Sequence, residues 1–182
     1  MCSALDAPVV APLTLVVMHK IMKNILFSII CVCGISIGAT ANALADTKRL
    51  NDFQTVSDFE EYLALKKQDC IDKSFGGSRA IACFTSYSEA WDYELNFYYK
   101  LLRKSLNNEE KESLKKAQLS WITNRDTTIH FNSKLLDKEF KDKNGTMYVA
   151  IRAGKASSTI VPIIKNRALL LKEWSETVAK GK

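Results

Sequence analysis

Residues 91–121 read WDYELNFYYKLLRKSLNNEEKESLKKAQLSW, a stretch in which two periodic segments are joined at Asn107-Asn108. Apolar side chains recur every three, four or seven residues on both sides of Asn107 and Asn108, which is the period of an amphipathic helix. An Asn followed at once by several glutamates is typical of a helix N-terminus. Because the link between the two periodic segments is so short, they are predicted to form an antiparallel helical hairpin.

The first helix of this hairpin is predicted from about Arg79 to Ser105. Its apolar stripe consists of Ile81, Phe84, Trp91, Leu95, Tyr98, Leu102 and Leu106. The second helix is predicted to begin at Asn107 or Asn108, to run to about Phe140, and to be stopped by Asn144-Gly145.

Upstream of the hairpin, Ser57-Asp58-Phe59-Glu60 has the pattern of a capping box and predicts a short helix to about Gln68. The polar stretch from Asp46 to about Ser57 is expected to be mobile. Ser74 to Ser78 contains two glycines and is expected to separate this helix from the next.

Downstream, Met147 to Ile151 is compatible with either a helical turn or a strand. A stretch of small residues from Gly154 to Thr159 follows, and Pro162 is expected to open a last helix. With no internal repeat and no linker, the sequence predicts an all-α chain. We expect a single small helical bundle of four or five helices, built on the long hairpin.

The N-terminal segment has the three parts of a secretory signal peptide. Met22-Lys23-Asn24 is basic, Ile25 to Ile37 is apolar, and Ala43-Leu44-Ala45 fits a cleavage site. We therefore expect a leader over residues 1–45 with its true start at Met22, and a helical domain over 46–182. The alternatives are an uncleaved anchor and a buried helix. A cleaved leader implies a periplasmic or secreted protein with no stable membrane insertion.

Loss of the leader changes the cysteine count and the charge. Of five cysteines, only Cys70 and Cys83 remain, and an even pair in an exported chain favours one disulfide over two buried thiols. With His130 as the one remaining histidine, four zinc ligands cannot be assembled, so neither a metal nor another cofactor is expected. The leader carries two of the lysines and one of the aspartates, so the net charge of +6 becomes +5.

Polar residues lie on the inner faces of both hairpin helices. Asp92, Asn96 and Tyr99 share one face of the first helix. The second helix places Gln118, Trp121 and Arg125 on one face in the same way, and the two faces meet in an antiparallel hairpin. Arg125 is expected to fork onto Asp92 or Glu94. This layer either fixes the register of the hairpin or shapes a surface for a partner.

These segments resemble the LprI-like lysozyme inhibitor N-terminal domain family, also called domain of unknown function 1311. The resemblance is close from Asp69 to Asp126 and looser at Arg167–Leu171. It implies an exported, disulfide-tied, all-helical bacterial envelope protein. Thr127-Thr128-Ile129 departs from the family pattern, in which a further Cys often follows Arg-Asp. The site residues that the resemblance implies are Trp91, Asp92, Glu94, Asn96, Tyr99, Gln118, Trp121, Arg125 and Asp126.

The leading functional hypothesis is a protein that binds, and inhibits by occlusion, a lysozyme or another cell-wall hydrolase. The alternative is an envelope interaction module with a different protein partner, such as a toxin immunity protein or an assembly factor. An enzyme is disfavoured because Asp92 and Glu94 face different sides of a helix and His130 stands alone. Nucleic-acid binding is disfavoured because the basic residues are interspersed with acids.

Overall fold

Four α-helices form the part of the chain that the computed structural model describes, residues 48–181. They are α2 (Val56–Lys73), α3 (Ala80–Ser105), α4 (Asn108–Glu139) and α5 (Thr146–Lys180), with short 3-10 helices η2 (Leu50–Asp52) and η3 (Gly77–Arg79). No strand occurs among residues 48–181, so the all-α prediction is confirmed. The predicted leader and its cleavage site, and Cys2, Cys31 and Cys33, lie outside the described residues.

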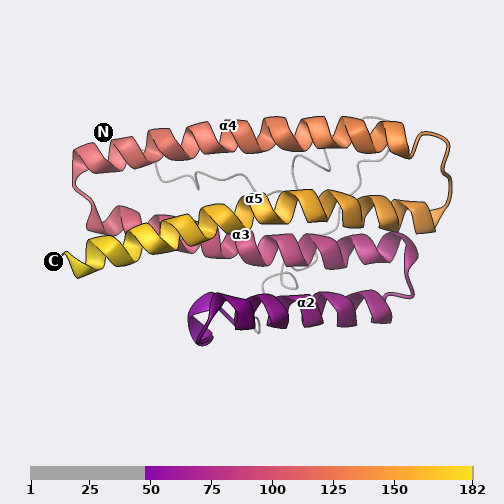
Figure 1. Ribbon diagram of the computed structural model, residues 1–182, viewed down its shortest axis with the longest axis horizontal. Coiled ribbons are helices and arrows are strands. Elements are labelled where there is room, and N and C mark those ends of the chain that lie inside the picture. Colours follow the sequence, from indigo (N-terminus) through magenta and orange to yellow (C-terminus); the bar gives the residue numbers. More distant parts are fainter. Residues whose placement is uncertain (1–47, 182) are drawn as a thin grey trace, which may run out of the picture.

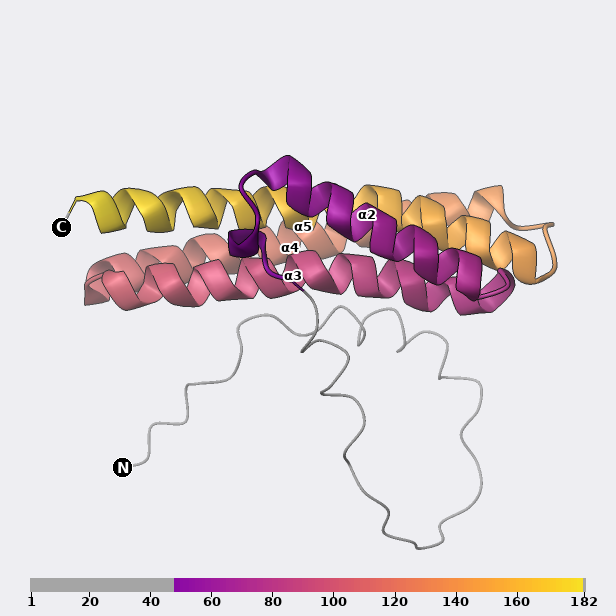
Figure 2. The ribbon, with the colours of Figure 1, turned by 90° about the horizontal axis from the view of Figure 1, so that it is seen from below.

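The helices are arranged around a close pair formed by α3 and α5 (Figure 1). α3 and α4 run antiparallel, as predicted, and α5 then returns parallel to α3. α2 packs against α3 and crosses the pair obliquely (Figure 2). The close approach depends on small residues, since a Cβ added at Gly154 would lie 3.2 Å from the Phe84 ring. The small-residue stretch of the sequence therefore belongs to a helix–helix contact.

The core lies between α3, α5 and α2. Trp91, Leu95, Ile164 and Leu171 have no exposed surface, and Phe59 of α2 is 1% exposed. Complete burial of side chains of this size contributes about 1.5–3 kcal/mol each. Trp91, Leu95, Tyr98 and Leu102 of the predicted stripe are therefore buried, whereas Ile81 is 37% exposed.

The hairpin helices begin and end close to where the sequence predicted. Asn107 caps α4, and its side chain accepts a hydrogen bond from the Glu110 backbone N–H at 3.0 Å. The Glu110 carboxylate accepts in return from the Asn107 N–H at 2.8 Å. This reciprocal pair fixes the start of α4 immediately after α3.

The segment before α2 differs from the prediction. Leu50 is only 3% exposed, so Lys48 to Thr55 is a packed segment rather than a mobile one. The capping box is formed by Thr55 and Asp58 instead of Ser57 and Glu60, because Thr55 has the extended backbone that an N-cap requires. α2 also continues past Gln68 to Lys73.

The C-terminal third also differs from the prediction. α4 ends at Glu139, and Gly145 with a φ of 101° precedes α5 instead of stopping α4. Met147 to Ile151 is helical, and Pro162 lies inside α5 rather than at its start. Proline has no N–H to donate to the Ser158 carbonyl, and both Pro162 and Ser158 lie at exposed positions of α5.

The predicted disulfide is confirmed. The Cys70 and Cys83 sulfurs are 1.94 Å apart, with Cα atoms 5.6 Å apart. The bond joins the last turn of α2 to the first turn of α3. It closes the connection between these helices, Ser74–Arg79, which we call the tip loop.

Candidate functional site

Trp91 lies in the core rather than on a surface. Its ring meets that of Phe59 edge-on, with centroids 5.1 Å apart, and it has no exposed area. This aromatic pair anchors α2 to α3. Tyr99 is likewise buried at 5% exposure, so two of the residues singled out from the sequence hold the bundle together.

Asp92 and Asn96 form a local pair on the side of α3 that faces α4. The Asn96 side-chain amide donates to the Asp92 carboxylate at 3.0 Å and to the Asp92 backbone carbonyl at 2.8 Å. Burial raises the pKa of Asp92 above its usual value, and the nearby Arg125 and the Asn96 hydrogen bond oppose that rise. Because the burial effect is the largest, the protein interior penalises the Asp92 charge.

Arg125 pairs with its own neighbour in sequence. Its Nε donates to Asp126 Oδ1 at 2.8 Å, and its Nη2 lies 2.7 Å from the same oxygen. The prediction that Arg125 would fork onto Asp92 or Glu94 is therefore wrong. The reason is positional, since Asp126 reaches the 3% exposed guanidinium from the half-exposed edge of α4, while Glu94 points away from α4.

Gln118 contacts the last helix. Its Oε1 accepts a hydrogen bond from Arg167 Nε at 2.9 Å in the interior. The Arg167 guanidinium lies 5.8 Å from the Trp121 ring and 5.4 Å from the Trp174 ring. Burial lowers the pKa of Arg167, and no carboxylate among the described residues forms a salt bridge with it.

These residues form a polar layer between α3, α4 and α5 that is incompletely hydrogen-bonded. We define the layer as Asp92, Asn96, Gln118, Trp121, Arg125, Asp126 and Arg167. Four of its buried atoms have no hydrogen-bond partner: Asp92 Oδ1, Gln118 Nε2, Arg125 Nη1 and Arg167 Nη2. Trp121 also stacks on Arg125, whose guanidinium carbon is 5.1 Å from the ring centroid.

Glu94 belongs to a second polar cluster on another side of α3. Arg49 Nε and Nη2 donate to the two Glu94 carboxylate oxygens at 2.5 and 3.0 Å. The Leu50 backbone N–H donates to the same carboxylate at 3.2 Å. The Arg49 guanidinium also stacks on Tyr93 and Phe97, at 4.2 and 4.3 Å from their ring centroids. We call this group the arginine clamp.

The arginine clamp fastens the segment before α2 to α3. The hydrogen bond to Glu94 is the main cause that raises the pKa of Arg49. Close by, the Tyr98 hydroxyl donates to Asn51 Oδ1 at 2.5 Å. Burial and the Glu94 charge raise the pKa of Tyr98 to about 12. Sequence reasoning missed Arg49 because it lies in a stretch without hydrophobic periodicity.

Both polar clusters are centred on buried side chains, Arg125 and Arg167 in the layer and Glu94 in the clamp, while Asp126 and Arg49 reach partly into solvent. His130 is exposed, and no group of three or more His, Cys, Asp or Glu side chains within residues 48–181 could hold a metal ion. Over the same residues, no helix is both long and apolar enough to span a membrane.

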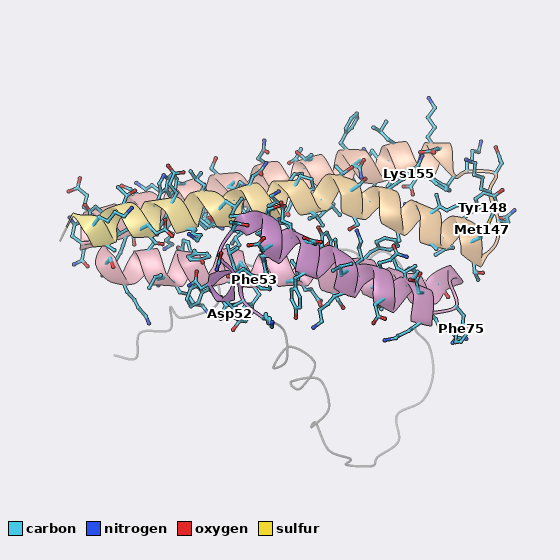
Figure 3. The ribbon with its side chains drawn as sticks, turned by 60° about the horizontal axis from the view of Figure 1, so that its bottom comes forward. Asp52, Phe53, Phe75, Met147, Tyr148 and Lys155 are labelled. Carbon is cyan, nitrogen blue, oxygen red and sulfur yellow. A yellow bond between two sulfur atoms is a disulfide. The ribbon has the colours of Figure 1, made fainter. Side chains whose placement is uncertain are left out.

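The tip loop is the most exposed apolar feature that the structure describes. Phe75 is 91% exposed, and its φ of 55° is the one positive value among the described non-glycine residues. Met147, at the start of α5, is 58% exposed and lies at the same end of the bundle (Figure 3). The sequence predicts Ser74 to Ser78 only as a break between helices. The signal for more than a break is an aromatic residue, Phe75, directly before two glycines.

Comparison with known proteins gives one match. The family described as "Lysozyme inhibitor LprI" matches residues 70–160, which is half of the chain. The match begins at Cys70 and covers the disulfide, the tip loop, α3, α4 and the first part of α5. No curated protein and no solved structure matches the chain significantly.

Proposed function

The chain belongs to the LprI lysozyme inhibitor family, and from this premise we propose that it is exported, binds a lysozyme-type muramidase and inhibits it by occlusion. The family match over residues 70–160 is the observation that carries the proposal. Inhibition of this kind requires no chemistry from the inhibitor. It requires a rigid surface that fills a glycan cleft and engages its two catalytic carboxylates.

The structure supplies the rigid frame that this proposal needs. The matched residues include the disulfide, α3, α4 with the reciprocal capping box at its start, and the first part of α5. Rigidity favours inhibition because little conformational entropy is lost on binding. We propose that the family-signature residues, from Trp91 to Asp126, maintain this frame, while exposed residues contact the enzyme.

Net charge is the observation that favours the alternative, an interaction module for a different envelope protein. A lysozyme that is itself basic would be repelled at long range by a chain of +5, which slows association. Exposed acids at the start of α4, including Glu109 and Glu112, provide local attraction to such an enzyme. A less basic muramidase avoids the repulsion altogether.

The test is an inhibition assay with the exported chain, purified with Cys70–Cys83 intact. A chicken-type lysozyme and a bacterial muramidase are each incubated with cell walls as substrate. The rate of lysis is measured at increasing concentrations of the purified chain. We expect saturable inhibition of at least one enzyme and binding by calorimetry. No inhibition and no binding at large molar excess for either enzyme would reject the proposal. Affinity capture from envelope extract would then identify the other class of partner.

A further inference from the structure

We propose that Phe75, displayed by the tip loop, is the side chain that enters the muramidase cleft. The inference rests on the proposed function and adds the contact residue to it. The partner surface that receives the tip loop is thus a carbohydrate-binding cleft that carries two carboxylates. Three features of the tip carry the argument: backbone strain, rigidity and charge.

Phe75 follows the end of α2 in a backbone conformation that bulky residues rarely adopt. It follows Ser74, the C-cap of α2, and lies in the left-handed region where glycine is the usual residue. A bulky side chain there costs about 1–2 kcal/mol, and this one recovers nothing by burial since it is 91% exposed. Strain combined with exposure points to a use outside the fold.

The tip loop holds this side chain in a defined position. The Ser74 hydroxyl donates to the Ile71 carbonyl at 2.7 Å and accepts from the Gly76 N–H at 3.2 Å. Gly77 packs against the start of α5, where an added Cβ would lie 3.1 Å from Thr146. The Cys70–Cys83 disulfide closes the base of the loop. Phe75 is therefore presented with little entropy to lose on binding.

The surroundings of the tip match a cleft with carboxylates. Of the acids at this end of the bundle, Asp69 is paired with Lys73 at 2.7 Å and Asp137 with Arg152 at 2.5 Å, whereas Asp72 and Asp142 are exposed and form no salt bridge within the described residues. Arg79 in the tip loop is exposed, as are Lys141 and Lys143 in the α4–α5 connection.

These three exposed cations outnumber the two unpaired acids, so the tip carries a small positive excess around an exposed aromatic. An aromatic ring stacks on sugar-binding subsites or their aromatic walls, and the cations face the carboxylates.

The experiment compares Phe75→Gly with Phe131→Ala in the purified chain. Glycine accepts the φ of 55° without strain, so Phe75→Gly should be at least as stable as the original chain in urea unfolding. Phe131 is the matched control, because it is another exposed aromatic, 62% exposed, but belongs to α4 and not to the tip loop. Inhibition of cell-wall lysis is measured against the muramidase that the unaltered chain inhibits, with and without a chitin trisaccharide.

We expect Phe75→Gly to weaken inhibition about 30-fold or more, as truncation of an aromatic anchor does. Phe131→Ala should inhibit within about twofold of the unaltered chain, and the trisaccharide should compete with binding. Equal inhibition by Phe75→Gly, or lack of competition by the sugar, overturns the inference while the proposed function stands. If the unaltered chain inhibits neither enzyme, the proposed function and this inference both fall.

Discussion

The arginine clamp and the polar layer lie on different sides of the same helix and differ in how fully their charges are satisfied. In the clamp, the Glu94 carboxylate accepts two bonds from Arg49 and one from the Leu50 backbone. In the polar layer, Arg167 has one neutral partner, Gln118, and four buried polar atoms have none. A saturated buried pair is costly to break, whereas a partly satisfied one is close to neutral against an apolar replacement. The clamp is therefore expected to stabilise the fold far more than the layer.

The largest expected effect is the loss of the clamp. Arg49→Ala leaves the Glu94 carboxylate, 2% exposed, with the Leu50 N–H alone. We expect a decrease of about 3 kcal/mol in the free energy of unfolding, measured by urea denaturation. The free energy of unfolding of Arg49→Lys should lie between those of the original chain and Arg49→Ala. Lysine keeps the charge but loses the paired hydrogen bonds to Glu94 and the stacking on Tyr93 and Phe97.

The matched control is Arg152→Ala. Arg152 pairs with Asp137 at 2.5 Å, but both side chains are substantially exposed. A surface pair of this kind contributes at most about 0.5 kcal/mol. Equal losses in Arg49→Ala and Arg152→Ala would show that the clamp is no more than a surface ion pair.

Which of these contacts the sequence could predict depends on their range. The periodicity gave the faces of Asp92 and Gln118 correctly, because residues on one helix face are fixed by local geometry. It gave the wrong partners for Arg125 and Glu94. Arg49 lies 45 residues before Glu94, in a segment whose packing depends on the α3 surface already being formed. Arg167 appeared only as part of a family-like motif, and no spacing rule links it to Gln118, 49 residues away.

The tip loop shows the same limit. Glycines at 76 and 77 predicted a break between helices, and the structure has one there. The positive φ of Phe75 and its exposure depend on how α2 ends and on the contact of Gly77 with Thr146. The sequence predicts Pro162 at a helix start because proline usually interrupts a helix, whereas the structure has it at an exposed position inside α5.

The next effect tests the polar layer. Gln118→Leu removes the one hydrogen bond of the buried Arg167 guanidinium, and we expect a loss of about 2 kcal/mol by urea denaturation. Adding Arg167→Met removes the stranded charge as well. The double variant should recover to within about 1 kcal/mol of the original chain. If the stability losses of the two substitutions were additive in the double variant, this would contradict the proposal that the buried Arg167 charge is incompletely satisfied.

A smaller effect is expected at the edge of the clamp. Tyr98→Phe removes the hydrogen bond to Asn51 and should cost about 1 kcal/mol. The pKa of Tyr98 in the folded chain is about 12, above the ordinary value of 10.0. Its contribution to stability is therefore complete below pH 10 and is lost as the pH rises through about 12. Phenolate absorbance should show a tyrosine that ionises late in the original chain and is missing from Tyr98→Phe.

The smallest effect separates the two clusters most directly. The folded-state pKa of Asp92 is raised, chiefly by burial, so the ionised carboxylate opposes folding. The stability contribution of Asp92 is highest below its ordinary pKa of 3.8 and falls as the pH rises through the folded-state value. Asp92→Asn should accordingly raise the free energy of unfolding at neutral pH by less than about 1 kcal/mol.

The same variant should flatten the pH dependence just above pH 3.8. Asp126→Asn is its counterpart, because it removes a carboxylate that is hydrogen-bonded to the buried Arg125 at 2.8 Å, and it should destabilise the chain. If Asp92→Asn instead destabilised the chain as much as Asp126→Asn does, Arg125 would be shared between both carboxylates in solution. The pairing that the hairpin geometry first suggested would then hold, and the polar layer would resemble the clamp.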